Sequence, residues 1–409
     1  MQCKFTLMSK DDFLNEFYKL LKPVDVWNGE IDSIKEIFEA KLLRHGITQN
    51  QAENLLAMQK RSLDGILEGT AKRVDVINLL KLGQFLGLET EALLRLYLSE
   101  LPQDMVAELE DARKKTFILA NFDIKNLNKA GFIKSKNDFD EIEQRINNYF
   151  GLSSIFQYTS HQYIPAFSKT KRGENTPMRE FWVRSAYSLF ESIKNPHAYD
   201  RDGLVRLLPK IRPYSMNVTH GLRTVTQALF HLGVTVIYQP YLPATQVRGA
   251  TFIINNKPCI VLTNLNKNYA TVWFALLHEL HHVLYDYDKI EGQVFHLTGE
   301  PDLFLLEDEA NNFSRDYFLP QDRAKFVYKF IDNTLVVDNL AKESQIHPSL
   351  IYNFYCYEMD AAGKGNYWGK YKHLMPDVTI ALKDINVNPF DHERIEETVN
   401  YLNENIFNL

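Results

Sequence analysis

Two histidines and a glutamate stand close together in an apolar stretch of the chain. His278, Glu279 and His282 form the pattern H-E-x-x-H inside residues 273–285, which are mostly apolar. On a helix, residues four apart lie on the same face, so both imidazoles can reach one metal ion while Glu279 lies beside them. Two imidazoles and a carboxylate that can take a proton from water form the layout of a zinc hydrolase. The alternative is a buried helix with merely hydrogen-bonded histidines, which is costly without a metal or partners.

A catalytic zinc ion needs a third protein ligand and an open position. In the compact pattern H-E-x-x-H-x-x-G-x-x-[HD], the third ligand would be Asp288. However, Tyr285 occupies the glycine position, where the chain must turn sharply. The compact pattern is therefore the weaker solution.

The other solution is a glutamate on a following helix. Apolar residues recur at helical spacing between 306 and 317 and stop before Pro320. Glu307 and Glu309 flank this stripe on opposite sides, so the periodicity leaves both open. Asn311 lies one turn after Glu307 and could hydrogen-bond a ligand imidazole, whereas Phe313 lies one turn after Glu309. This favours Glu307 as the third ligand, with Asn311 behind a ligand histidine.

Short strands precede the H-E-x-x-H segment. Residues 222–232 predict an amphipathic helix, and residues 234–238, 251–255 and 259–263 predict strands, with a hairpin turn at 256–258. An edge strand of such a small antiparallel sheet could hold an extended peptide. The fold class expected is α+β and mostly helical.

The N-terminal part has a different pattern. Short helices are predicted at residues 33–44, 48–56, 60–67 and 76–86. Helix, three-residue turn and helix is the spacing of a helix-turn-helix, whose second short helix can enter a DNA major groove. Gln59, Lys60, Arg61 and Ser62 are then the best candidates for DNA contacts. Because charges balance over residues 31–90, a helical module used for dimerisation or docking is the alternative.

Length, net charge and cysteine content limit the number of domains, the partners and the cellular location that we expect. The 409 residues allow about two to four domains, and the net charge of −6 gives no global reason to bind nucleic acid. Three scattered cysteines, the lack of a signal-peptide pattern and the lack of a long apolar run lead us to expect a cytoplasmic protein with no membrane span. The expected divisions are an N-terminal segment (1–30), a helix-turn-helix domain (31–95), a helical connecting region (96–195), a peptidase domain (196–358) and a helical tail (359–409).

Two segments resemble known families. Residues 278–282 followed by residues 307–320 are similar to the ImmA/IrrE family of bacterial zinc metallopeptidases, as are residues 208–212, 249–253, 257–263 and 346–351. Residues 47–69 resemble the xenobiotic-response-element (Cro/repressor) type of helix-turn-helix, with Ala57 in place of the usual turn glycine. The order of the two segments looks like the HigA-type fusions of these domains.

The resemblance implies a zincin-like (gluzincin) domain that binds Zn²⁺ through His278, His282 and Glu307. By the same analogy, Glu279 is the general base, and the substrate is a specific protein such as a transcriptional repressor or a toxin. A DNA operator would be a partner of the helix-turn-helix, and a homodimer is compatible with it. The alternative is a DNA-binding regulator or antitoxin whose peptidase-like domain acts mainly as an interaction module.

Overall fold

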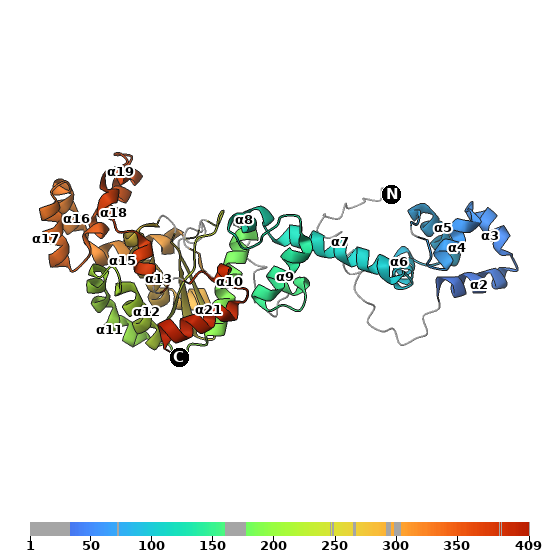
Figure 1. The fold of residues 1–409 in the computed structure, drawn as a ribbon, viewed down its shortest axis with the longest axis horizontal. Helices are drawn as coiled ribbons and strands as arrows, with labels where there is room; N and C mark the ends of the chain where they lie inside the picture. Colours follow the sequence, from blue (N-terminus) through green and yellow to red (C-terminus); the bar gives the residue numbers. More distant parts are fainter. Residues whose placement is uncertain are drawn as a thin grey trace, which may run out of the picture. The chain divides into compact units, whose positions relative to one another are not determined.

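The computed structural model forms two compact units, Met1–Lys114 and Lys115–Leu409 (Figure 1). The predicted N-terminal segment, residues 1–30, lies outside the described residues. The structure describes residues 33–71, 73–159, 177–245, 247, 249–264, 267–291, 296–297, 304–383, 385 and 387–408.

The N-terminal unit is a bundle of short helices. They are α2 (Ile34–His45), α3 (Gln49–Leu56), α4 (Lys60–Leu67), α5 (Val76–Leu86) and α6 (Thr90–Ser99), and α7 (Gln103–Asn121) continues into the second unit. Ser33 and Thr48 start α2 and α3 with capping boxes, in which each side chain accepts a backbone N–H of the first turn. Apolar side chains from α2 to α6 share one core. The structure confirms the four helices predicted here.

The turn between α3 and α4 is made by an alanine. Ala57 adopts the left-handed conformation, with φ 48° and ψ 50°; its N–H donates to the Asn54 carbonyl, and the N–H of Met58 donates to the Glu53 carbonyl. Glycine adopts this conformation without a steric penalty, whereas a Cβ adds about 1–2 kcal/mol. The chain therefore turns where the helix-turn-helix spacing requires it, with some strain.

The C-terminal unit contains a four-stranded mixed sheet in the order β1-β3-β2-β4. Its strands are β1 (Thr235–Tyr238), β2 (Gly249–Ile254), β3 (Lys257–Leu262) and β4 (His296–Leu297). The prediction of an antiparallel sheet was wrong in one respect, because β1 pairs with β3 in parallel. In the sheet, β3 lies between β1 and β2. Strand β2 is antiparallel to β3, and β3 is parallel to β1.

The hairpin turn lies one residue earlier than the sequence predicts. Asn255 and Asn256 both have positive φ angles, 51° and 60°, as in a two-residue type I′ turn. Lys257 and Pro258 are part of β3, where they pair with Ile254 and Ile253. Asparagine tolerates the left-handed region better than most residues, which explains why the turn falls there.

Helices enclose this sheet and share its core. The helix α13 (Tyr269–Tyr285) contacts β2 and β3, and α15 (Phe304–Phe318) packs along α13 (Figure 1). The remaining α-helices are α8 (Ile124–Lys129), α9 (Phe139–Phe150), α10 (Pro177–Ile193), α11 (Arg201–Ile211), α12 (Gly221–His231), α14 (Tyr287–Glu291), α16 (Gln321–Val327), α17 (Thr334–Ser344), α18 (Pro348–Ala361), α19 (Trp368–Tyr371), α20 (Val378–Leu382) and α21 (Ile395–Leu402). The described chain is thus α+β and mostly helical, as predicted.

The structure draws no boundary near residues 195 or 358, where the sequence suggested divisions. Most buried apolar side chains between Ile118 and Phe407 belong to a single hydrophobic core. The helix α10 packs on α21, and the Arg145 guanidinium donates to the carbonyls of Phe390, His392 and Glu393. The connecting region from Lys115 onward and the tail therefore form one compact unit with the segment predicted as a peptidase. None of the helices in the described part of the chain has both the length and the apolar character needed to cross a bilayer.

Candidate metal centre

The helix α13 buries His278, Glu279, His281 and His282 among apolar side chains. Asn268 caps its first turn by accepting the Ala270 N–H, and the apolar faces of the helix pack on the sheet and on α15. As a result, His278 and His282 are 1% and 0% exposed, and Glu279 is 0% exposed. Polar groups buried this deeply are costly unless they have partners.

The two histidines point their Nε2 atoms at each other and anchor their Nδ1 atoms elsewhere. The Nε2 atoms lie 3.1 Å apart. His278 Nδ1 lies 3.1 Å from Asn311 Oδ1, and His282 Nδ1 lies 3.0 Å from Asp286 Oδ2. The structure thus brings together His278, His282 and Asn311, three residues that the sequence nominated for one site.

These contacts favour a tautomer with the proton on Nδ1 in each histidine. An amide oxygen and a carboxylate can only accept hydrogen bonds, so both Nδ1 atoms are donors, and the lone pair of each Nε2 faces the other ring. Two lone pairs at 3.1 Å repel each other unless they share a proton or a metal ion. Two nitrogens bound to one tetrahedral zinc ion, at about 2.0–2.1 Å each, lie about 3.3 Å apart. The pair therefore fits a shared metal ion, with both rings oriented by outer hydrogen bonds as in known metal sites.

Glu279 faces the sheet on the neighbouring side of α13. Thr251 Oγ1 donates to its Oε2 at 2.6 Å. The backbone of Gly249 lies against the other oxygen, because a Cβ at this position would be only 2.4 Å from Glu279 Oε1. Strand β2 therefore fixes the position of this carboxylate, with Thr251 bonded to one oxygen and Gly249 close to the other.

A second group of possible ligands lies at the end of the same helix. His281, His282 and Asp286 have ligand atoms within 4.8 Å of one another and could hold a metal ion. However, Lys289 Nζ donates to Asp286 Oδ1 at 2.8 Å, so a dication there would lie near an ammonium group. Burial favours the protonated form of Asp286, but the hydrogen bonds from Lys289 and His282 outweigh it and hold its pKa below the usual range. Burial, followed by the charge of His282, lowers the pKa of His281 to about 4.

The three candidates for the third metal ligand, Glu307, Glu309 and Asp288, lie at different positions around α13 and α15. Glu307 lies on α15 one turn before Asn311, about 6 Å along the helix axis; its side chain lies outside the described residues. Glu309 is exposed and lines a different cavity, beside His281. Asp288 is also exposed and lines a cavity at the far end of α13. Of these three candidates, Glu307 lies one helical turn from Asn311, the residue that contacts His278.

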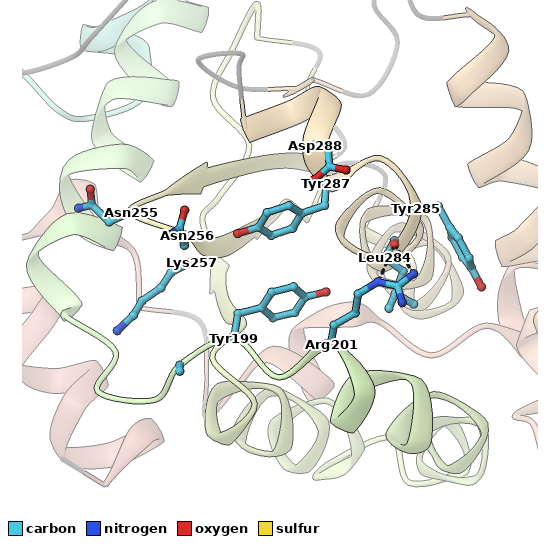
Figure 2. A pocket seen from close by; sticks show the side chains of 10 residues that line it. Tyr199, Arg201, Asn255, Asn256, Lys257, Leu284, Tyr285, Tyr287 and Asp288 are labelled. Carbon is cyan, nitrogen blue, oxygen red and sulfur yellow. Dashed lines mark hydrogen bonds between the residues drawn. The ribbon is translucent and has the colours of Figure 1, made fainter.

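The cavity at the C-terminal end of α13 has a volume of about 730 Å³ and holds none of the three H-E-x-x-H side chains. Figure 2 shows Tyr199 and Tyr287 stacked in it, with Arg201 reaching the Leu284 carbonyl. Tyr199 Oη also donates to the Val283 carbonyl at 3.2 Å. The last carbonyls of a helix have no partners within the helix, so these donors secure the end of α13 just after His282.

The helix-turn-helix residues lie in the other unit. Gln59, Lys60 and Arg61 are exposed at the start of α4, and Ser62 is half-buried. Asp64, on the next turn, accepts a hydrogen bond from a glutamine of α3 at 2.7 Å. Within this unit, the side chains of Gln59, Lys60 and Arg61 are therefore accessible to a binding partner.

Sequence reasoning missed three residues of the centre. Asp286 lies four residues after His282, so helical spacing could have found it. Thr251 and Gly249 reach Glu279 only because β2 packs on α13, and their positions carry no local signal. Comparisons of the chain with protein-family models, with curated protein sequences and with solved structures found no match. The function proposed below therefore rests on the geometry of the chain and on the resemblance of its motifs.

Proposed function

We propose that the C-terminal unit is a zinc-dependent endopeptidase that cleaves a specific protein, such as a transcriptional repressor. The observation that carries this proposal is the convergence of His278 Nε2 and His282 Nε2 at 3.1 Å, with each Nδ1 held by an acceptor. The resemblance of the motifs to the ImmA/IrrE family supports the same assignment.

His278, His282 and Glu307 would hold the metal. Two imidazoles and one carboxylate suit zinc, and a set of three leaves one position for substrate or water. The alternative group of His281, His282 and Asp286 is the weaker choice, because Lys289 already occupies its carboxylate. We therefore assign Asp286 to the orientation of His282.

Bound zinc would supply Lewis acidity to the peptide carbonyl. Glu279 would accept a proton at Oε1 from the attacking water, while Thr251 keeps Oε2 in place. As the water oxygen bonds to the carbonyl carbon and the C–N bond breaks, Glu279 would pass that proton to the leaving nitrogen. The products are a carboxylic acid and an amine, and no other reactant is needed.

The test is a substitution that keeps the shape of Glu279 and removes its basicity. Glu279→Gln should retain zinc and lose about 10²- to 10⁴-fold in kcat on a quenched-fluorescence peptide library or an unfolded protein substrate. Glu309→Gln is the matched control, since Glu309 is an exposed glutamate on α15, and it should cleave like the wild type. Cleavage by Glu279→Gln at the wild-type rate would remove the proposal.

The N-terminal unit supports a second role, which is compatible with the first. Exposed Gln59, Lys60 and Arg61 start the helix that would enter a major groove. We propose binding to an operator, with a DNA-binding regulator or antitoxin as the function if the peptidase-like unit is catalytically idle. A gel shift on DNA upstream of the gene should weaken with salt and with Lys60→Ala. Absence of binding at low salt would remove this role.

A further inference from the structure

A cavity of about 600 Å³ adjoins the histidine pair on the N-terminal side of His278. Thr271, Phe274, Ala275 and His278 lie along one face of α13 and form one wall. Side chains of α15, α18 and α19, with Gln321 at the start of α16, provide the others. A substrate held at His278 would therefore place a neighbouring group in this cavity.

The cavity has more acidic than basic side chains. Asp308, Asp316 and Glu358 line it, against the single guanidinium of Arg315. Arg315 is already bonded to Glu358 at 2.8 Å and to Asp316 at 2.9 Å. Asp308 forms no ion pair with any described residue, so the lining keeps negative charge that a ligand can neutralise.

Aromatic rings make up much of the remaining wall. The rings belong to Phe274, Phe354, Tyr357 and Trp368. Aromatic faces attract ammonium and guanidinium groups and also bury the methylene chain that carries them. Carboxylates next to such rings favour a long side chain with a cationic end.

A buried amide provides an independent sign of a ligand. Asn353 is only 7% exposed and lines the cavity. Its Oδ1 accepts from Asn268 Nδ2 at 2.9 Å, whereas its Nδ2 forms no hydrogen bond with a described residue. This Nδ2 carries N–H donors at the cavity wall, so it is suited to a carbonyl oxygen of a bound peptide.

We infer that this cavity binds a lysine or arginine side chain of the substrate, next to the peptide bond that is cleaved. Asn353 Nδ2 holds a substrate carbonyl, and Asp308 faces the cationic end. This specificity rests on the proposed peptidase function, but binding of the side chain can be measured without cleavage.

The cleavage experiment uses the zinc-loaded full chain and peptides that differ only in lysine or its uncharged isostere norleucine. The value of kcat/KM should be about tenfold higher for lysine, and Asp308→Asn should reduce this ratio about threefold. Asp202→Asn is the matched control, because Asp202 is an exposed aspartate in the first turn of α11 and does not line the cavity. Equal cleavage of both peptides, or a preference that Asp308→Asn leaves unchanged, would overturn the inference while the peptidase stands.

The binding experiment uses the Glu279→Gln chain titrated with Nα-acetyl-lysinamide, its norleucine analogue and its glutamate analogue. The lysine probe should bind most tightly and shift the indole signal that Trp368→Phe removes. Binding of this kind without cleavage by the wild type would remove the peptidase and keep the cavity's preference. Tighter binding of the norleucine or glutamate probe, or no shift of the Trp368 signal, would overturn the inference.

Discussion

A single methyl group at Gly249 should disable Glu279 while leaving the histidines intact. Gly249 is the first residue of β2, and a Cβ there would lie 2.4 Å from Glu279 Oε1 and 3.0 Å from its Cδ. Alanine is compatible with the extended backbone of a strand, so the effect is one of space. The Gly249→Ala substitution therefore tests whether the position of this carboxylate matters.

The geometry gives the size of the effect. Ordinary van der Waals contacts begin at 3.4 Å, so the carboxylate must move by about 1 Å. Displacement of a catalytic group by this distance reduces a rate by about 10²-fold. Overpacking of the site should also lower the free energy of unfolding by about 1–3 kcal/mol. Zinc content should not change, because His278 and His282 contact other residues.

The assay compares kcat/KM, zinc content and unfolding midpoint for Gly249→Ala and the wild type. Gly369→Ala is the matched control, since a Cβ at Gly369 would meet nothing within 4 Å. If Gly249→Ala folds poorly, Thr251→Val tests the same carboxylate by removing its hydrogen bond. Wild-type kcat/KM in Gly249→Ala with normal zinc content would refute the role given to Glu279.

Three other substitutions test the support of His282, the helix-turn-helix and a buried histidine. Asp286→Asn should weaken zinc affinity about 10- to 100-fold in a chelator competition, because His282 loses its carboxylate partner, and unchanged affinity would contradict this. Ala57→Gly relieves a left-handed residue and should raise the free energy of unfolding in urea by about 1 kcal/mol, whereas a lower value would argue against strain there. Burial lowers the pKa of His347, whose Nδ1 accepts the Ser349 N–H, so the unfolded chain binds a proton more readily and stability falls as pH drops below about 6.5. His347→Asn keeps the cap and should reduce this loss between pH 7.5 and 5.5; an equal loss would show that another group titrates.

The sequence predicts features that depend on local spacing. Helical periodicity places His278 and His282 on one face of α13, and it places Asn311 one turn after Glu307 on α15. The helix-turn-helix segments follow from the spacing of the helices and the turn between them, and the structure begins α4 and α5 at the predicted residues. In each of these cases the signal lies within a few turns of one helix.

Features that depend on distant packing could not be predicted in this way. The contact between Thr251 and Glu279 joins residues 28 apart and requires the sheet to pack on α13. The parallel pairing of β1 with β3 depends on the course of the chain between β1 and β2, which has no periodic signal. The common core of α10 and α21 likewise follows from long-range contacts, so the sequence suggested boundaries where the structure has none.

The zinc content of the purified full-length chain tests the central claim most directly. The wild type and His281→Ala should each hold about one zinc ion per chain, whereas His278→Ala should hold almost none, because zinc binding requires both convergent Nε2 atoms. Loss of zinc in His281→Ala with retention in His278→Ala would place the metal with Asp286 instead. A wild type that binds no zinc would contradict the assignment altogether.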